Sequence, residues 1–311
     1  MDLKLIGTFV HVAWQGGFNR AAIALNVSQS TTSTRIARLE EELGKVLFNR
    51  RGSHIELTEE GQVFLAFAEK MLGLKSEALI ALDKIKTQEG PERALRLGSN
   101  NMSAVVIVPS AVKRYQEIAS TDNARINVLV EGTRALMPAL MEGAAEIAFV
   151  NPDLAHSHCN VLWYFESQIT LVAHPGHRYA GEKIQPADLI DEQFVTCPLG
   201  PVSQVIKRLE GTMGKNARTL VESNDSSLIC SLVEFGVGLS FLPRACVSLQ
   251  LAEGTLAEVT VEGFQRFRWE TVLVRWRERQ SSPEAELFLS MLREPSADGK
   301  DRPFLASAPR G

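Results

Sequence analysis

The sequence predicts an α/β protein that carries an all-α winged helix-turn-helix unit at its N-terminus. Three observations lead to this prediction. Residues 3–43 show the apolar spacing of amphipathic helices and no strand pattern. Residues 95–293 alternate short apolar runs with helical patterns, which is typical of an α/β sheet. A long helical pattern over residues 58–87 separates the two parts, and 311 residues suffice for two to three domains.

The N-terminal part follows the order of a helix-turn-helix motif. GGFN at residues 16–19 ends a first helix, and Asn26-Val27 makes a tight turn between a short second helix and a longer third one. Ser28 is a suitable N-cap for the third helix, and Gly44 ends it. Apolar residues then alternate around an Arg-Gly-Ser turn, which predicts a two-stranded wing. The predicted elements are helices at 3–14, 20–25 and 29–43 and the wing at 45–57.

The third helix begins with an unusual run of small polar side chains. Ser28 to Thr34 are all hydroxyl or amide residues, although Ser and Thr each cost about 0.5 kcal/mol in a helix interior relative to Ala. In a helix-turn-helix motif this helix end enters the major groove, where such groups can contact phosphates and base edges. Its free N–H groups also favour phosphate. The alternative is that these residues only cap and solvate the helix.

The distribution of charge favours contact with nucleic acid at this end. Residues 1–52 hold seven Lys/Arg and four Asp/Glu, although the whole chain has a net charge of −4. A basic N-terminal region on an otherwise acidic chain is a charge asymmetry of the kind found in nucleic-acid-binding proteins.

The long helix at 58–87 begins with Thr58 as N-cap and two acidic residues in its first turn. Its apolar residues recur every seven positions, which predicts a seam between the helices of two copies. The alternative is a helix that packs only on its own domain. QEGPE at 88–92 ends the helix as a hinge. The two apolar rows are Phe64, Met71, Ala78 and Ile85, and Phe67, Leu74 and Ala81.

The remainder predicts a largely parallel sheet, in which ligands bind at the carboxyl ends of strands. About 200 residues are generous for one sheet, so two lobes are expected. Residues 295–311 are rich in Pro, Ser, Gly and charge, and we expect a disordered tail. Strands are predicted at 94–98, 126–130, 146–150, 168–174, 194–197, 219–222, 238–243, 256–261 and 268–276, and helices at 102–118, 133–142, 202–211, 225–236 and 283–293.

The chain resembles the LysR-type transcriptional regulators. The specific part is FNRAAIALNVSQSTTSTRIARLEEELGKVLFNRRGSHIELTEEG, with its Ala-Ala pair, its Val-Ser-Gln-Ser turn, and Ile36, Leu39-Glu40 and Gly61 at the family's offsets. LRLG before a polar loop, EIAFV, HPGH at 174–177 and VEFGVGLSFLP at 233–243 match more loosely. Thr31, Thr32 and Thr34 depart from the family pattern, which often has small apolar residues at the first two positions and a basic residue at the third.

The resemblance implies a DNA-binding regulator whose promoter binding is modulated by a small-molecule effector. It implies a winged helix-turn-helix on a linker-helix dimer, a two-lobed effector domain similar to periplasmic solute-binding proteins, and a homotetramer built as a dimer of dimers. Double-stranded promoter DNA, a small-molecule effector and RNA polymerase are the expected partners. The domains expected are 1–57 (DNA-binding), 58–90 (linker helix and hinge) and 91–294 (effector-binding, with one lobe of 91–163 plus 266–294 and a second lobe of 164–265).

The resemblance also implies the residues of two sites. Gln suits adenine in a bidentate pair, and Arg suits phosphates or the minor groove. The effector residues lie in loops that follow strands. None of them is Lys or Arg, which favours a neutral or polar effector, or one whose charge meets backbone amides. Each could instead be an ordinary cap. The DNA-binding residues are Gln29, Ser30, Ser33, Arg35, Arg38, Arg50 and Arg51, and the effector-binding residues are Asn100, Asn101, Ser103, Thr133, Asn151, Thr196, Ser203 and Asn224.

We expect no enzyme activity, no metal and no other cofactor. His156, His158 and Cys159 could form a metal cluster, but no second ligand pair faces them in the sequence. Cys197 lies in a loop that resembles that of peroxide-sensing relatives, yet Cys230 is too far along the chain to match their pairing. A hydrolase that used Cys197 would need a base and an oxyanion site that no motif marks.

A cytoplasmic protein is expected, because the N-terminus has no signal peptide and no run of about 18 apolar residues predicts a membrane span. The four cysteines include no CxxC pair, so free thiols are expected. The alternative function is a small-molecule (solute) binding protein with a vestigial DNA-binding module. That alternative leaves residues 1–90 unexplained.

Overall fold

A computed structural model describes residues 2–51, 54–86, 94–118, 125–155, 159–198, 200–277 and 279–293. Three sequence predictions lie outside these residues: the hinge at 88–92, the His156 and His158 cluster, and the tail at 295–311. In the part of the chain that the structure describes, no helix is long and apolar enough to cross a membrane.

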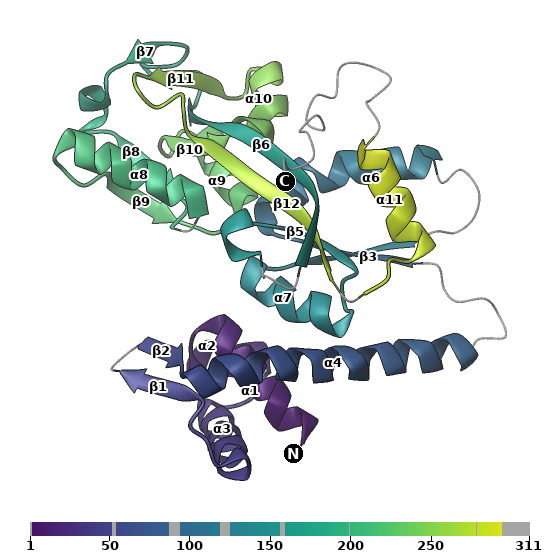
Figure 1. Cartoon of the computed structure of the whole chain (residues 1–311). Helices are drawn as coiled ribbons and strands as arrows, with labels where there is room; N and C mark the ends of the chain where they lie inside the picture. The colour runs from purple at the N-terminus through teal and green to yellow at the C-terminus, as the bar shows by residue number, and fades with distance from the viewer. Residues whose placement is uncertain are drawn as a thin grey trace.

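The N-terminal unit contains the helices and the wing that the sequence predicts (Figure 1). Ser28 accepts a hydrogen bond from the Thr31 N–H at 3.1 Å, and Gly44 ends the third helix with a φ of 64°. The second helix begins at Phe18 with Gly17 as N-cap, two residues earlier than predicted. The elements are α1 (Leu3–Gln15), α2 (Phe18–Ala24), α3 (Gln29–Leu43), β1 (Phe48–Arg51) and β2 (His54–Leu57).

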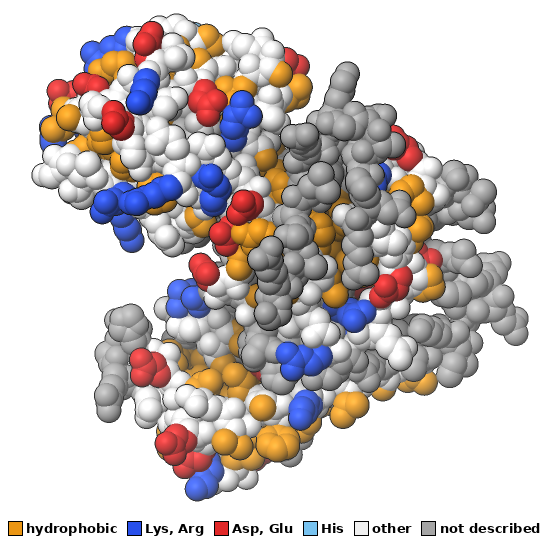
Figure 2. All heavy atoms as spheres, turned by 45° about the horizontal axis from the view of Figure 1, so that its top comes forward, with side chains coloured by type: hydrophobic (Ala, Val, Ile, Leu, Met, Phe, Trp, Pro, Cys, Tyr) orange, Lys and Arg blue, Asp and Glu red, His pale blue; other side chains and the backbone are white. Residues whose placement is uncertain are grey.

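The linker helix α4 (Glu59–Lys86) divides its two apolar rows between two environments. Phe64 lies 5.1 Å from the Phe9 ring, and Met71 packs on the same N-terminal core. Phe67 and Leu74 are 59% and 65% exposed. Figure 2 shows apolar side chains along the lower edge of the molecule, where α4 runs. Phe64 and Met71 of the first row therefore pack on their own domain, as the alternative interpretation expected, whereas Phe67 and Leu74 of the second row are exposed.

The remaining strands form a mixed sheet instead of the largely parallel one that the sequence predicted. The cause is β6 (Cys159–Ala173), a single strand of 15 residues that the sequence analysis recognised only from residue 168. β6 pairs antiparallel along the whole of β12 (Arg268–Trp276), which comes from the far end of the domain. Strand alternation predicts parallel neighbours only where a helix connects adjacent strands. The large sheet has the order β4 (Arg125–Val130), β3 (Ala94–Ser99), β5 (Ile147–Val150), β12, β6, β11 (Ala257–Val261) and β7 (Lys183–Ile184), with β10 (Ser240–Pro243) on β6. The strands β8 (Gln193–Thr196) and β9 (Arg218–Glu222) pair with each other.

Two lobes share β6 and β12 (Figure 1). The predicted lobe boundary at residues 163/164 falls inside β6, and the one at 265/266 falls just before β12. The first lobe contains β3 (Ala94–Ser99), α5 (Asn101–Val106), α6 (Val108–Ile118), β4 (Arg125–Val130), α7 (Thr133–Glu142), β5 (Ile147–Val150), η1 (Pro152–Leu154) and α11 (Pro283–Arg293). The second contains β7 (Lys183–Ile184), η2 (Pro186–Leu189), β8 (Gln193–Thr196), α8 (Gly200–Met213), β9 (Arg218–Glu222), α9 (Ser226–Glu234), β10 (Ser240–Pro243), η3 (Arg244–Val247), α10 (Ser248–Glu253) and β11 (Ala257–Val261).

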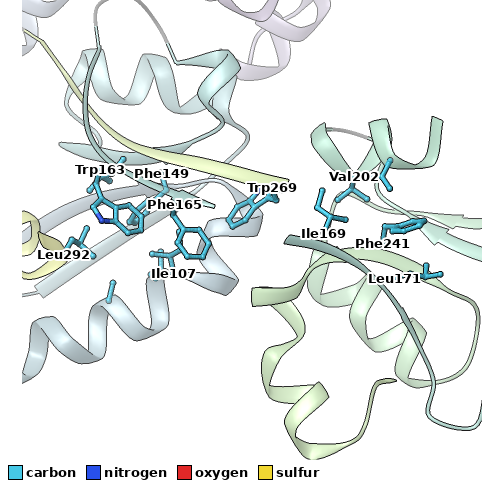
Figure 3. Close-up of a cluster of buried hydrophobic side chains, with 14 of the residues drawn as sticks. Ile107, Phe149, Trp163, Phe165, Ile169, Leu171, Val202, Phe241, Trp269 and Leu292 are labelled. Atoms are coloured by element: carbon cyan, nitrogen blue, oxygen red, sulfur yellow. The ribbon is translucent and has the colours of Figure 1, made fainter. Parts of the chain in front are cut away.

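One continuous apolar core joins the two lobes. Figure 3 shows Trp163 and Phe165 in the first lobe, and Ile169 and Phe241 in the second, with Trp269 between the two groups. The Phe165 and Trp269 ring centroids lie 5.8 Å apart. The strands that cross between the lobes and this shared apolar core therefore hold the two lobes together.

Candidate functional site

The N-terminal end of α3 presents small polar side chains at the surface. Gln29 and Ser30 are exposed, and Ser33 is half-buried one turn along the helix. Gln29 Nε2 donates to Ser33 Oγ at 3.2 Å, so these two side chains lie on one face. The first turn of α3 has no acidic residue. Neutral donors and acceptors at the positive end of a helix suit phosphates and base edges.

Thr32, one of the departures from the family pattern, belongs to the core of this unit. It is fully buried, and its hydroxyl donates to the Ser28 carbonyl at 3.2 Å. That bond satisfies the buried hydroxyl, which explains how Thr occupies a position where a small apolar residue is common.

The two arginines of α3 differ in their surroundings. Arg35 is half-buried, and its guanidinium lies 3.4 Å from the hydroxyl of Thr8 in α1, so it also links α3 to α1. Arg38 is exposed and pairs with Glu42 one turn away at 3.3 Å. An exposed pair of this kind contributes little to stability, so Arg38 can exchange its carboxylate partner for a phosphate. Arg50 and Arg51 lie on β1, opposite Ile55 and His54, and the structure describes only their backbone.

Four of the predicted effector residues form one polar network at the strand ends of the first lobe. The Asn100 side chain caps α5 by accepting from the Ser103 N–H at 2.8 Å, and its amide donates to Asn151 Oδ1 at 3.2 Å. The Asn151 N–H donates to Thr133 Oγ1 at 3.1 Å. Ser103 Oγ lies 3.0 Å from the hydroxyl of Thr271. Thr271 was not among the predicted residues, because it lies inside β12 rather than at a strand end.

The other predicted residues belong to the second lobe or face it. Asn101 Nδ2 donates to the Asn224 carbonyl at 3.2 Å, a bond between the lobes. The Thr196 carbonyl accepts from the N–H of Ser223, the neighbour of Asn224, at 3.0 Å. Ser203 donates to Gly200 within its own helix at 2.8 Å. We call the place where α5 meets α9 and η3 the inter-lobe junction. Asn101, Asn224 and Thr196 lie at or beside it, and Ser203 makes a local bond instead.

A hydroxyl that the sequence analysis did not single out lies at the same place. Ser226 is buried at the start of α9, and its Oγ has no hydrogen-bond partner within the described residues. Asp225 caps the same helix through the Ser227 and Leu228 N–H groups at 2.9 and 3.2 Å. A carboxylate already meets this helix end, so the second lobe disfavours an anion here. Ser226 is a neutral donor for a polar group.

Three of the four cysteines pack on one small core of the second lobe. Cys230 is buried there, and Cys197 and Cys246 are partly buried against the same residues. Burial raises the pKa of Cys230 to about 11, with a smaller contribution from Glu234. Burial also raises the pKa of Cys246. Cys246 Sγ contacts Met102 Sδ at 2.9 Å across the inter-lobe junction. The thiols of Cys230 and Cys246 are therefore protonated near neutral pH.

The two strands that cross between the lobes each carry a carboxylate, and the two residues lie side by side in neighbouring strands. Glu166 of β6 and Glu270 of β12 are register partners. Tyr164 donates to Glu166 at 3.2 Å, and burial together with both carboxylates raises the pKa of Tyr164. This part of the sheet has a negative charge and repels anions.

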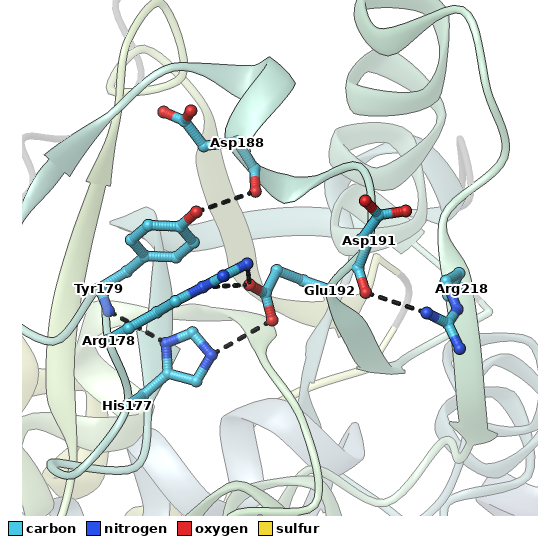
Figure 4. A network of polar contacts seen from close by, with 7 residues as sticks. All are labelled: His177, Arg178, Tyr179, Asp188, Asp191, Glu192 and Arg218. Atoms are coloured by element: carbon cyan, nitrogen blue, oxygen red, sulfur yellow. Dashed lines mark hydrogen bonds and ion pairs between the residues drawn. The ribbon is translucent and has the colours of Figure 1, made fainter.

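The HPGH turn at 174–177 forms a structural network (Figure 4). His177 Nε2 lies 3.3 Å from Glu192 Oε2, and Arg178 pairs with the other oxygen of the same carboxylate. The Tyr179 hydroxyl donates to the Asp188 carbonyl at 3.2 Å. These bonds hold the end of β6 against the segment that leads into β8. Among the described residues, no group of three or more His, Cys, Asp or Glu side chains could hold a metal ion.

Comparison with known proteins assigns both parts of the chain to family models. Residues 3–62 match the model described as "Bacterial regulatory helix-turn-helix protein, lysR family", and residues 88–296 match "LysR substrate binding domain". The HTH-type transcriptional regulator GltR of Bacillus subtilis is 24% identical over 296 residues, which cover 94% of this chain and 97% of GltR. A probable RuBisCO transcriptional regulator of Thalassiosira pseudonana is 26% identical and covers 85% of this chain and 88% of its own length.

Solved structures show the same fold. Full-length CbnR complexed with its target DNA matches with a TM-score of 0.52 at 20% identity, over 94% of this chain and 99% of CbnR. DarR of Vibrio fischeri in complex with DNA matches with a TM-score of 0.53 at 19% identity, over 94% of this chain and 98% of DarR.

Proposed function

Because the chain belongs to the LysR family of transcriptional regulators, with a helix-turn-helix DNA-binding domain and an effector-binding domain, we propose that α3 binds promoter DNA and that a small molecule at the inter-lobe junction alters this binding. The observation that carries the proposal is the exposed end of α3. It offers amide and hydroxyl groups with no acidic residue in the first turn. The proposed DNA contacts are Gln29, Ser30, Ser33, Arg35, Arg38, Arg50 and Arg51.

We propose that α4 joins two copies of the chain. Val63 and Leu82 are 63% and 56% exposed, and with Phe67 and Leu74 they extend the apolar row along the helix. A surface groove lined by Glu59, Glu60, Val63, Phe64 and Phe67 begins this row. Two recognition helices on one dimer suit two half-sites of a promoter. A tetramer built from two such dimers, and contact with RNA polymerase at the promoter, complete the proposal.

The proposed effector is a small molecule with neutral hydrogen-bonding groups. Asn100, Asn101, Asn151 and Thr133 supply amide and hydroxyl groups from the first lobe, and Ser226 supplies a buried hydroxyl from the second. In the described structure Asn101 is bonded to Asn224, so an effector would replace this contact. The remaining proposed contacts are Ser103, Thr196, Ser203 and Asn224.

The experiment that tests the function is a gel shift and footprint on the DNA upstream of the protein's own gene, at rising salt. We expect two protected half-sites spaced by whole helical turns, with an affinity that falls steeply as salt increases, because phosphate contacts release counterions. Duplexes selected from a random pool provide a second source of sites. A folded, dimeric protein that protects and selects no DNA would contradict the proposal and favour a solute-binding protein with a vestigial DNA-binding module.

A further inference from the structure

The helix α7 is buried on two sides. Seven of its ten residues are buried: Thr133, Leu136, Met137, Pro138, Ala139, Leu140 and Met141. A helix on the surface of a domain buries one stripe only. One side of α7 packs on β3 and β5 of its own lobe, and the other packs on α1 and α4 of the N-terminal part. We call this second contact the α7 seam.

Specific side-chain contacts accompany the seam. The ring centroids of Trp14 in α1 and Trp276 at the end of β12 lie 6.0 Å apart. Trp14 Nε1 donates to Glu69 of α4 at 3.0 Å, which holds the indole in place. His11 Nε2 lies 3.8 Å from Glu142 Oε1. Buried side chains of α7 form one apolar cluster with buried side chains of α1 and α4, so the seam is a packed interface.

The N-terminal end of α7 belongs to the predicted effector site. Thr133, its first residue, accepts the Asn151 N–H at 3.1 Å, and Asn151 in turn accepts from Asn100 at 3.2 Å. Ten helical residues span about 15 Å. One helix therefore connects the polar network of the first lobe to the DNA-binding unit.

The recognition helix lies on the opposite side of that unit. Figure 1 shows α3 on the side of α4 that faces away from α7, so the seam leaves α3 uncovered. The exposed apolar row of α4, with Phe67 and Leu74, is also outside the seam. The seam is thus compatible with dimerisation and with DNA binding, and its effect is to fix the orientation of each DNA-binding unit.

We propose that α7 is the element through which the effector domain sets the orientation of its own DNA-binding unit, by contact with α1 and α4. This inference rests on the proposed function. Packed interfaces change between discrete arrangements, so a change in the network at Thr133 shifts the whole helix against α1. Binding to one half-site needs no fixed orientation. Binding to two half-sites at once does, because simultaneous engagement depends on geometry.

The first test compares two buried tryptophans of the same lobe. Trp276→Leu removes the contact with Trp14 of α1 that accompanies the seam, and Trp163→Leu is the matched control, because Trp163 stacks on Phe165 in the core of the same lobe. Each variant is measured on a two-half-site duplex and on a half-site duplex, both selected with the wild type. We expect Trp276→Leu to weaken binding to the full site about tenfold and to the half-site less than about twofold. Trp163→Leu should change neither affinity.

Circular dichroism and a melting curve show whether each variant is folded. If a Leu variant does not fold, Trp276→Phe or Trp163→Phe takes its place.

The second test asks whether the two ends of α7 are coupled. Thr133→Val removes the acceptor of the Asn151 N–H, and its effect on full-site affinity is measured with Trp276 present and with Trp276→Leu. We expect a change of about threefold or more that disappears when the seam is broken, as a coupling free energy requires.

Equal effects of Thr133→Val in both backgrounds, no effect in either, or parallel losses on full and half sites would overturn the inference while DNA binding itself stands. Failure of the proposed function is distinguishable, because the wild type would then select no duplex at all, and the inference would fall with it.

Discussion

The carboxylate of Glu40 in α3 accepts the backbone N–H of Leu47 at 2.7 Å, at the point where the chain leaves the helix for the wing. The same oxygen lies 3.3 Å from the Phe48 N–H. One side chain of the recognition helix therefore sets the position of the wing, and both parts would meet DNA as one unit.

Replacing Glu40 with Ala should lower the free energy of unfolding by about 1–3 kcal/mol, because two partly buried N–H groups lose their acceptor. Urea denaturation followed by circular dichroism measures this change. Glu41→Ala is the matched control, since Glu41 is an exposed neighbour on the same helix and should cost less than about 0.5 kcal/mol. Equal effects of the two variants would contradict the anchoring role of Glu40.

Replacement of two glycines of α4 by Ala should change the stability of the folded protein in opposite directions. A Cβ on Gly61 would lie 2.2 Å from the Leu47 carbonyl oxygen, whereas a Cβ on Gly73 would meet nothing within 4 Å. We expect Gly61→Ala to destabilise by about 3 kcal/mol, and Gly73→Ala to stabilise by about 0.5–1 kcal/mol, because Ala is the better helix former. Thermal unfolding of both variants decides the point. A neutral Gly61→Ala would show that the wing can move away from α4.

Gln29→Ala should relax specificity at one base pair and cost about 1–3 kcal/mol on the selected site. Arg50→Ala should instead weaken binding to all sequences and reduce the salt slope by about one, as expected for a phosphate contact. Affinities for a set of single-base variants of the site, at two salt concentrations, separate the two effects. An unchanged base preference in Gln29→Ala would show that Gln29 does not read a base.

Leu74→Glu should break the contact between the α4 helices of two copies and so lower the mass of the assembly, because it places a charge in the exposed apolar row of α4. Leu249→Glu in α10 is the control, since Leu249 is 63% exposed against 65% for Leu74. Light scattering after size-exclusion chromatography gives the mass of each variant. If Leu74→Glu keeps the wild-type mass, the contact between copies lies elsewhere.

Stability should fall as pH rises above 9, in part because of Cys230. Its pKa rises from 9.0 to about 11 in the folded state. The stability associated with a raised pKa is complete below the unfolded value and is lost as pH rises through the folded value. The window therefore runs from about pH 9 to 11. Urea midpoints at pH 8 and pH 10.5 should differ less in Cys230→Ala than in the wild type, and an equal difference would contradict the role of Cys230.

Sequence reasoning located the N-terminal elements closely, because their signals are local. Ser28, Gly44 and Thr58 act at the helix ends where the sequence predicted them. The sequence could not distinguish the two apolar rows of α4, since a repeat of seven residues does not show which row packs on its own domain. Phe64 and Phe67 look alike in the sequence, and only tertiary packing assigns the first to the core and the second to the surface.

The pairing of strands that are far apart in the sequence was harder to predict. β6 reads as an interrupted pattern because its residues alternate between buried and exposed faces in the part that pairs with β12, and are all buried from Ile169 onward. The predicted helix at 102–118 is two helices that break at Ile107, before Pro109. The network of Asn100, Asn151 and Thr133 was predicted from strand ends. Thr271 and Ser226 had no such signal, since one lies inside a strand and the other begins a helix.

The passage of β6 through both lobes has a consequence for engineering. A cut at residues 163/164 would sever this 15-residue strand, and a cut at 265/266 would separate β12 and Trp269 from the shared apolar core, so neither lobe could be transplanted alone. Chimeric regulators that combine this ligand specificity with another operator would have to take residues 94–293 as an indivisible cassette and place the fusion point before β3.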